Sequence, residues 1–108
     1  MTDFLQQQCQ QRAAALGEQA IRDHLKQMSG WREDGGAIEK TFAFDGWLET
    51  VAFVDALAWM CHVENHHPEL HVQHDRCRVR FTTHSAGGIS ANDFICAAKA
   101  DALVAFLG

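Results

Sequence analysis

The stretch HVENHHPELHVQHDRCRVRFTTH, residues 62–84, decides the fold of this chain, because within it a helix must end and two strands must follow. Pro68 disfavours the α conformation in the residue before it, so a helix that enters from the N-terminal side ends there. Beyond the proline we expect a short strand over residues 70–73, a turn at Asp75-Arg76 and a longer strand over residues 77–84. This part of the sequence therefore predicts a hairpin that directly follows a helix.

The longer strand has the clearest alternation of side chains in the chain. One set of alternate residues is Cys77, Val79, Phe81 and Thr83, and the residues between them are arginine, threonine and finally His84. Successive side chains of a strand point to opposite faces of a sheet. The pattern therefore predicts one apolar face and one polar face, with His84 at the end of the polar face.

Outside this stretch the sequence predicts the remaining elements of a single domain, residues 1–108, in which residues 1–12 form a polar extension. We expect, in chain order, a helix over residues 13–28, a hairpin over residues 31–44 with its turn at Asp34-Gly35-Gly36, a helix over residues 46–65 with Asp45 as its N-cap, and a last helix that Ser90 opens. Hairpins with segregated helices are typical of an α+β fold. The prediction is a four-stranded antiparallel sheet with three helices packed on one face, in the order α-β-β-α-β-β-α.

Two features, one residue and one helix, modify this picture. Lys40 is the one polar member of an otherwise apolar row, Ile38, Phe42 and Phe44, in the second strand. The helix over residues 46–65 is unusual in another way, because its apolar residues form a broad surface rather than one stripe. Such a helix is expected to be covered on more than one side, by the sheet and by a partner subunit.

Length, composition and charge exclude several classes of protein. A chain of 108 residues with 47% hydrophobic residues fits one folded domain. Its net charge is −5 and its basic residues are scattered, which argues against nucleic-acid binding. No apolar run approaches the ~20 residues of a membrane span, and the polar N-terminus lacks the apolar region of a secretory signal. We therefore expect a cytoplasmic protein without a membrane or nucleic-acid partner.

The four cysteines are widely spaced and form no CxxC pair: they are Cys9, Cys61, Cys77 and Cys96. A zinc knuckle or a redox dithiol normally shows close pairs of cysteines. Three of the four lie in apolar segments. The sequence therefore predicts reduced, buried thiols.

Five of the seven histidines fall within residues 62–74, and three explanations compete for this cluster. His62 and His66 are four residues apart, a spacing that on a helix would suit a metal, but the glutamate that a zincin has after its first histidine is replaced here by Val63. The histidines could also form a polar surface without chemistry, which suits His71 and His74. The third explanation is acid–base catalysis, because imidazole can both give and take a proton near neutral pH. On residue types alone, catalysis stands only slightly above the polar surface.

The order and spacing of these residues resemble a known family, the pterin-4a-carbinolamine dehydratases. The matching residues are His66-His67-Pro68-Glu69, Thr82-Thr83-His84, Gly87-Gly88-Ile89-Ser90 and Asp93, with Gly30-Trp31, Phe42, Phe44 and Val51-Ala52-Phe53 upstream. The spacing from His67 to Asp93 agrees with the family pattern without a gap, and the resemblance extends over about residues 21–106. It implies the α+β fold described above, association into dimers or tetramers, and no metal or organic cofactor.

The resemblance also implies an activity, the dehydration of a 4a-hydroxytetrahydropterin to the quinonoid dihydropterin in recycling of a tetrahydrobiopterin-type cofactor. A general acid must protonate the leaving hydroxyl group and a general base must accept a proton from a ring nitrogen. By resemblance, the catalytic residues are His66, His67 and His84. The assignment of acid and base among them stays open.

Further residues are implied as substrate-binding by their places in the motif: His62, Asn65, Pro68, Thr83 and Asp93. Asp93 has a second reading, because Ser90-x-x-Asp93 is a capping-box pattern that would secure a helix start. Both roles are compatible with each other. Pro68 would fix the turn that aims the two adjacent histidines.

Three positions depart from the family pattern. The family usually has an acid where this chain has His62, an aromatic residue where it has His74, and in animal members an acid at Asn65. The loss of nearby negative charge makes an imidazole easier to deprotonate. Our hypothesis is a shifted pH optimum or a different pterin, and a pH–rate profile equal to that of an ordinary member would count against it.

The alternative function is a non-catalytic or divergent relative that binds a pterin or a partner. By resemblance, such a relative could be linked to molybdopterin metabolism or act as a dimerisation cofactor, as the family's fold does for a transcription factor in animals. A chain that had lost its enzymatic activity is expected to have lost motif histidines. His66, His67 and His84 are all present.

Overall fold

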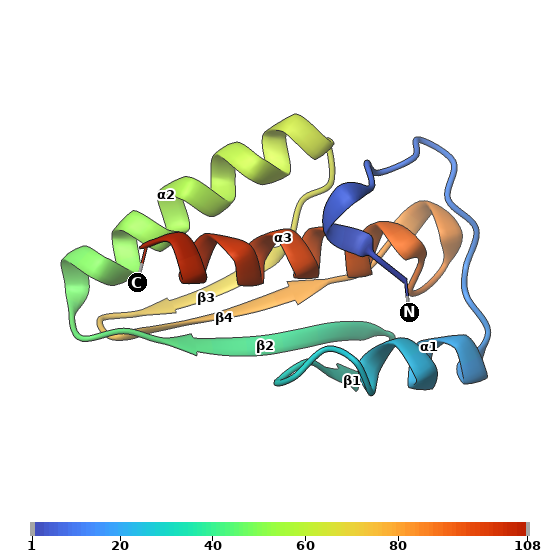
Figure 1. Cartoon of the computed structure of the whole chain (residues 1–108), viewed down its shortest axis with the longest axis horizontal. Helices are drawn as coiled ribbons and strands as arrows, with labels where there is room; N and C mark the ends of the chain where they lie inside the picture. The colour runs from blue at the N-terminus through green and yellow to red at the C-terminus, as the bar shows by residue number, and fades with distance from the viewer. Residues whose placement is uncertain (1, 108) are drawn as a thin grey trace.

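The computed structural model describes residues 2–107, with side chains for residues 2–105. Its helices and strands are, in chain order, η1 (Phe4–Gln6), α1 (Glu18–Leu25), β1 (Arg32–Asp34), β2 (Ala37–Ala43), α2 (Trp47–Glu64), β3 (Glu69–Gln73), β4 (Arg76–Phe81), η2 (His84–Ala86) and α3 (Ala91–Leu107), where η marks a short 3₁₀ helix. This order confirms the predicted α-β-β-α-β-β-α pattern (Figure 1).

All four strands form one antiparallel sheet in the order β1-β2-β4-β3. The turn between β1 and β2 uses Gly35 and Gly36, whose φ angles are 56° and 79°. Two successive residues with positive φ produce the turn whose twist matches that of a two-stranded hairpin, and glycine adopts it without strain. The predicted turn at this position is confirmed.

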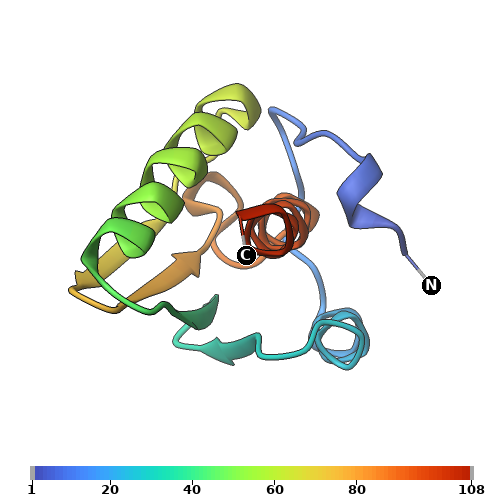
Figure 2. The ribbon, with the colours of Figure 1, turned by 60° about the vertical axis from the view of Figure 1, so that its left-hand side comes forward.

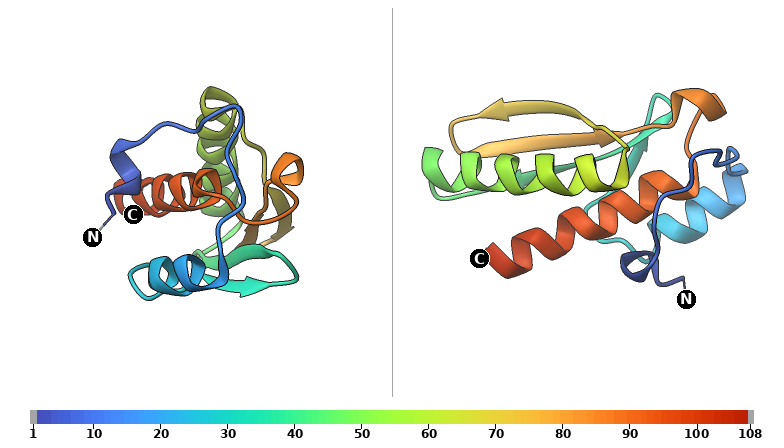
Figure 3. Two further views of the ribbon diagram at one scale, coloured as in Figure 1. Left: turned by 90° about the vertical axis from the view of Figure 1, so that its right-hand side faces the viewer. Right: turned by 90° about the horizontal axis from the view of Figure 1, so that it is seen from above.

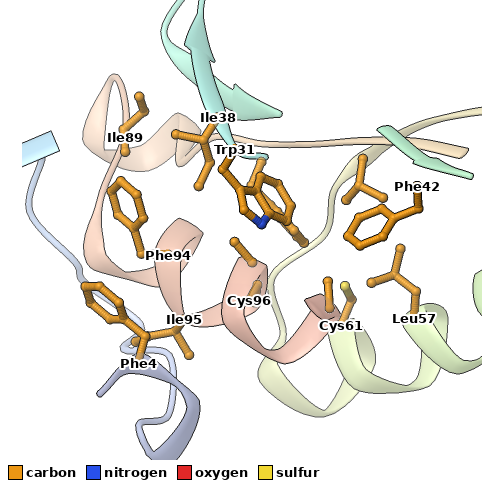
Figure 4. Packing of buried hydrophobic residues seen from close by; sticks show 14 of the residues in the cluster. Phe4, Trp31, Ile38, Phe42, Leu57, Cys61, Ile89, Phe94, Ile95 and Cys96 are labelled. Atoms are coloured by element: carbon orange, nitrogen blue, oxygen red, sulfur yellow. The ribbon is translucent and has the colours of Figure 1, made fainter. Parts of the chain in front are cut away.

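The helices α2 and α3 lie side by side over one face of the sheet, and α1 lies at the β1 end of the same layer (Figures 2 and 3). The hydrophobic core fills the space between these helices and the sheet (Figure 4). Its largest fully buried side chains include Ile38, Phe53, Leu57, Val79, Phe81 and Phe94. The alternation predicted for β4 is confirmed, because Cys77, Val79 and Phe81 are buried while Arg76 and Arg78 are exposed. The opposite face of the sheet carries charged side chains.

The first predicted helix is shorter than expected. Residues 13–28 were expected to be helical, but α1 covers Glu18–Leu25 alone. The backbone N–H of Leu16 donates to the carbonyl of Ile89 (2.8 Å), and Ala15 forms a bridge with Ser90. This pairing with a distant segment holds the backbone extended before the helix, an effect that local apolar spacing does not reveal.

The predicted N-cap of α2 and the predicted end of the last strand are also wrong by a few residues. Gly46, not Asp45, precedes the first turn of α2, because the backbone of Phe44 is still bonded to Asp75 (2.8 Å) and the chain leaves the sheet one residue later. β4 ends at Phe81 rather than residue 84. Beyond it, residue 83 pairs with residue 88 and the chain turns into η2.

Lys40 lies on the apolar face of β2, as its row predicts, and the structure explains how the charge is accommodated. Its Nζ atom bonds to Oδ1 of Asp101 on α3 (2.8 Å) and to the carbonyl of Ser29 (3.1 Å). The other oxygen of Asp101 accepts a hydrogen bond from the indole of Trp31 (3.0 Å). The lysine therefore links the sheet to α3 at the margin of the core.

The N-terminal arm, residues 2–16, packs along α3. Phe4 is buried against Phe94, with ring centroids 5.5 Å apart. Gln10 and Asn92 exchange hydrogen bonds between backbone and side-chain amide (2.7 and 2.8 Å). The part of the chain predicted as a polar extension thus includes specific anchors to the last helix.

Only one stripe of α2 is buried, formed by Thr50, Phe53, Leu57 and Cys61. Its other side exposes a set of apolar side chains that we call the α2 surface: Trp47, Leu48, Val51, Trp59 and Val63. Leu48, Trp59 and Val63 are 78%, 66% and 75% exposed. None of the helices within residues 2–107 combines the length and the apolar content needed to cross a bilayer.

Candidate functional site

The end of α2 releases the two adjacent histidines from the helix. Asn65 adopts the left-handed conformation (φ 52°). Its N–H donates to the carbonyl of His62 (3.2 Å), and the N–H of His66 donates to the carbonyl of Cys61 (3.1 Å). This pair of bonds is a Schellman motif, which needs a residue with positive φ. Among the residues other than glycine, asparagine tolerates this conformation best. Because the helix ends at Glu64, the prediction that Pro68 stops it nearby is confirmed.

His66 is held by a buried carboxylate. Its Nε2 atom lies 2.6 Å from Oδ1 of Asp93, and the two side chains are 12% and 0% exposed. The imidazole also lies parallel to the ring of Phe81, with centroids 5.9 Å apart. A carboxylate on one side and an aromatic face on another leave this histidine a single orientation.

The second oxygen of Asp93 belongs to the start of α3. Oδ2 accepts hydrogen bonds from the backbone N–H of Ser90 (2.8 Å) and from the hydroxyl of Thr83 (2.9 Å), and Oγ of Ser90 accepts one from the N–H of Asn92 (3.2 Å). These bonds form the capping box that the sequence predicts. The capping role of Asp93 is therefore present in the structure together with its contact to His66.

The hydrogen-bond directions in this network follow from the acceptor-only character of a carboxylate. The hydroxyl of Thr83 gives its proton to Asp93, so the 2.7 Å contact between Thr83 and Ser90 must use the Ser90 proton. Asp93 then accepts at both oxygens, and His66 presents an N–H from Nε2. The Nδ1 atom of His66 remains for another partner.

His67 and His84 are exposed, in contrast to His66. His84 begins η2 directly after the buried Thr83. The hydrogen bond from Thr83 to Asp93 therefore holds the residue on the N-terminal side of His84. Pro68 is half-buried and separates His67 from the first residue of β3, Glu69. The network thus connects the segment that carries His66 and His67 with the segment that carries His84.

A cavity of about 360 Å³ lies beside His84. Its walls come from the β1–β2 turn, the beginning of β3, the end of β4 and the glycines after η2: Gly35, Gly36, Ala37, Glu69, Arg80, Thr82, His84, Gly87 and Gly88. Of the three histidines predicted to be catalytic, His84 is the one in the lining of this cavity. Apart from His84, none of these residues was predicted to be catalytic or substrate-binding, although Gly87-Gly88 was considered for a backbone contact with the ligand. The residues of the β1–β2 turn and Arg80 join them only through the pairing of strands.

Arg80, one of the residues that line this cavity, is held by carboxylates. Nη1 of Arg80 bonds to Oε1 of Glu39 (2.9 Å) and to Oδ2 of Asp34 (3.1 Å). The hydrogen bond from Arg32, supported by Arg80, holds the pKa of Glu39 below its ordinary value although burial opposes this change. Arg80 is therefore a fixed cation at this wall rather than a freely moving one.

His62 lies apart from this network. Its side chain is exposed in the last turn of α2 and meets the ring of Trp59 edge to face, with centroids 6.2 Å apart. Since His66 lies beyond the helix end, the helical His62–His66 pair that would suit a metal does not exist. Within residues 2–107, no group of three or more His, Cys, Asp or Glu side chains has an arrangement that could hold a metal ion.

The two remaining histidines of the cluster are surface residues. His71 and His74 are exposed, and Nδ1 of His74 is 3.7 Å from Asp75. Among the predicted site residues, the structure thus brings together His66, Thr83 and Asp93, with His84 adjacent in the chain. It leaves the predicted site residue His62 outside, together with His71 and His74, which the sequence placed on a polar surface, and it gives Asn65 a backbone role.

Comparisons with known proteins identify the family. A family model described as pterin 4 alpha carbinolamine dehydratase matches residues 14–103. A Stenotrophomonas maltophilia (strain K279a) protein provisionally named as such a dehydratase is 53% identical over 90 residues, which cover 82% of this chain and 78% of its own. A protein of the same provisional name from Nitrosospira multiformis is 44% identical over 95 residues, covering 88% and 84%.

Two solved structures share the fold. A transcriptional coactivator/pterin dehydratase from Brucella melitensis superposes with a TM-score of 0.79 at 28% identity, over 82% of this chain and 96% of its own. A pterin dehydratase-like protein identified as a RuBisCO assembly factor in the alpha-carboxysome gives a TM-score of 0.61 at 28% identity, over 68% of this chain and 88% of its own. From the family match and the close relatives, this chain belongs to the pterin-4a-carbinolamine dehydratase family.

Proposed function

We propose that this chain is a cytoplasmic enzyme that dehydrates a 4a-hydroxytetrahydropterin to the quinonoid dihydropterin and so recycles a tetrahydrobiopterin-type cofactor. One observation carries the proposal: a buried carboxylate, Asp93, fixes His66 at 2.6 Å and, through Thr83, fixes the segment that begins with His84 at the wall of a cavity. Acid–base catalysis needs imidazoles held in defined orientations around one ligand.

The chemistry requires two proton transfers. A general acid protonates the hydroxyl on carbon 4a, the carbon–oxygen bond breaks, and water leaves. A general base takes the proton from the ring nitrogen next to carbon 4a, and the electrons of that N–H bond form the new double bond to the carbon. The proton given by the acid and the proton taken by the base balance, so the enzyme needs no net source of protons.

His66, His67 and His84 are the proposed catalytic residues. His66 is oriented by Asp93 and presents its Nδ1 atom, whereas the exposed rings of His67 and His84 can reach a ligand from solvent. We assign Asp93 and Thr83 to positioning, and Pro68 to setting the turn after His67. The proposed substrate contacts of His62 and Asn65 rest on the motif alone.

The test is a dehydration assay with a synthetic 4a-hydroxytetrahydropterin, compared with the spontaneous rate. Variants His67→Ala and His84→Ala are expected to lose roughly a hundredfold or more, the usual contribution of a general acid or base. His71→Ala and His74→Ala are matched controls, since both remove an exposed imidazole outside the network. A wild-type protein that leaves the spontaneous rate unchanged refutes the enzyme, and unaffected His67 and His84 variants refute the residue assignment.

We further propose that the protein works as a homodimer or homotetramer. The exposed apolar side chains of the α2 surface and the free edge of β3, which carries Leu70 and Val72 at 38% and 40% exposure, are the features that support association. Exposed apolar faces and unpaired strand edges are costly on an isolated subunit.

A second candidate function is a binding module without catalysis. The α2 surface favours it, since such a surface can also receive a different protein, and the similar alpha-carboxysome protein is named as an assembly factor. The assay above separates the two candidates. A chain that binds a pterin without accelerating dehydration, or that binds none, would support the module.

A further inference from the structure

Two sulfur atoms from distant parts of the chain lie in contact. The Sγ atoms of Cys9 and Cys96 are 3.5 Å apart, although the residues are 87 positions apart in sequence. Cys96 is fully buried on the core side of α3 (Figure 4). Cys9 is partly exposed and lies between η1 and α1, in a part of the arm without helix or strand. One thiol is therefore fully buried, and the other is partly exposed and lies outside regular secondary structure.

Polar contacts on both sides hold the arm in this place. The backbone N–H of Cys9 donates to Oε1 of Glu64 (2.8 Å), whose other oxygen accepts from Nζ of Lys99 (2.8 Å). The next residue, Gln10, exchanges two hydrogen bonds with Asn92 (2.7 and 2.8 Å). These hydrogen bonds thus fix the backbone of the arm at Cys9 and Gln10, next to Cys96.

We propose that Cys9 and Cys96 are an oxidation site, at which a hydroperoxide such as hydrogen peroxide forms a reversible disulfide that fastens the N-terminal arm to α3. The sulfur of Cys9 attacks a peroxide oxygen, the O–O bond breaks, and Cys9 becomes a sulfenic acid with release of water. The sulfur of Cys96 then displaces hydroxide from the Cys9 sulfur, and this hydroxide leaves as water with the Cys96 proton. In sum, two thiols lose two electrons and two protons while one hydrogen peroxide becomes two waters.

Burial and protonation set the order of these steps. The hydrogen bond with Cys9 and the burial of the thiol raise the pKa of Cys96, so Cys96 keeps its proton and is a poor first nucleophile. A peroxide from solvent meets Cys9 first, since Cys96 is 0% exposed. The second step needs only a short movement: a disulfide is ~2.05 Å long, so the sulfurs must approach by about 1.5 Å.

The other two cysteines are less suited to this chemistry. Cys61 is buried on α2 and faces the same region as Cys96 (Figure 4), but burial raises the pKa of its thiol to about 12. Cys77 is buried in β4, on the covered face of the sheet. Within the described residues, Cys9 and Cys96 are the pair whose sulfurs touch.

Trypsin separates the thiols cleanly, which makes the test direct. Cys9 lies in the peptide 1–12, Cys96 in the peptide 81–99, and Cys61 in the peptide 41–76. Reduced full-length protein is treated with hydrogen peroxide, unfolded, alkylated and digested without reductant. We expect a monomeric chain lighter by two hydrogen atoms and a linked peptide 1–12/81–99, both reversed by dithiothreitol.

Two variants and a melting curve complete the experiment. Cys9→Ser is expected to abolish the linked peptide, while Cys61→Ala, a matched control that keeps both partners, is expected to retain it. The oxidised protein should melt at a higher temperature, because the bond closes a long loop in the unfolded chain. A link between Cys9 and Cys61, a link between two chains, or a Cys9 sulfenic or sulfinic acid with Cys96 still alkylated overturns the proposal.

Discussion

Nε2 of His66 lies 2.6 Å from Oδ1 of Asp93, while Oδ2 of the same carboxylate receives the N–H of Ser90 at the start of α3. One buried side chain therefore joins the loop after α2 to the first turn of the last helix. The sequence offers substrate binding and capping of a helix as two readings of Asp93; the structure shows the cap at one oxygen and a contact with His66 at the other. The proposed chemistry depends on the contact with His66, and the stability of α3 depends on the contact with Ser90. The two roles can therefore be separated by experiment.

Asp93→Asn is expected to keep the cap and to disturb the histidine. The amide oxygen can still accept from Ser90 and Thr83, but the amide nitrogen then faces Nε2 of His66 as a donor and forces the opposite tautomer. Loss of a hydrogen bond to a charged group corresponds to about 1.5–3 kcal/mol, so the dehydration rate should fall about ten- to a hundredfold. The measurement is kcat together with the melting temperature.

Asp101→Asn is the matched control for this substitution, since it changes an aspartate on the same helix that bonds to Lys40 and Trp31 instead of a histidine. It is expected to lower stability and to leave kcat unchanged. Wild-type kcat in the Asp93→Asn protein would show that His66 needs no orientation by this carboxylate.

Local signals in the sequence are sufficient for the parts of the site that depend on nearby residues. The helix end before Pro68, the glycine turn at residues 35–36 and the capping box of Ser90 and Asp93 each involve bonds between residues at most five positions apart. Such bonds are determined by residue type and spacing. These features were accordingly predicted to within a residue or two.

Contacts between distant segments could not be obtained in this way. The predicted helix over residues 13–28 begins only at Glu18 because Leu16 bonds to Ile89, and Lys40 is tolerated on an apolar strand face because it bonds to Asp101. Likewise, wide spacing in sequence predicted reduced, buried thiols and no redox dithiol, whereas packing of the arm brings Cys9 to Cys96. Tertiary contacts override local preferences at each of these places.

Substitutions of Asn65 separate a backbone role from a ligand role. With φ at 52°, Asn65→Gly should preserve or slightly improve the cap of α2, whereas Asn65→Ala should cost about 1 kcal/mol of unfolding free energy because alanine is strained in this conformation. Urea denaturation of both variants measures this difference. If kcat/KM falls in the stable Asn65→Gly protein, the side chain contacts the substrate and its role exceeds capping.

The stability of the protein is expected to fall in acid, partly through Glu39. The hydrogen bond from Arg32 holds the pKa of this carboxyl below its ordinary value of 4.5, with help from Arg80 and against the effect of burial. A carboxyl with a lowered pKa in the folded state contributes stability that is complete above the unfolded pKa and is lost as the pH falls through the folded pKa. The unfolding free energy should therefore decline below about pH 4.5.

Glu39→Gln should lower the unfolding free energy at neutral pH and make its decline in acid shallower, because the group that titrates is gone. Glu33→Gln is the control, since Glu33 is exposed in the neighbouring strand and forms no ion pair among the described residues. Urea titrations between about pH 6 and pH 3 measure both slopes. Equal slopes for the Glu39→Gln variant and the wild type would exclude Glu39 as a source of the acid sensitivity.

The α2 surface is expected to be an interface between copies of this chain. Leu48 and Val63 lie near the two ends of the helix and are 78% and 75% exposed, so a charge at either position should break apolar packing between subunits without touching the core of one subunit. Leu48→Glu and Val63→Glu should shift the protein from a dimer or tetramer to a monomer, as measured by size-exclusion chromatography with light scattering. Leu5→Glu is the matched control, because Leu5 is an exposed apolar residue of η1, and η1 lies on the other side of α3 from α2 (Figure 2). If the wild-type protein is monomeric at high micromolar concentration, this surface is not an interface between copies and fits a different partner instead. If Leu5→Glu causes equal dissociation, the interface lies elsewhere.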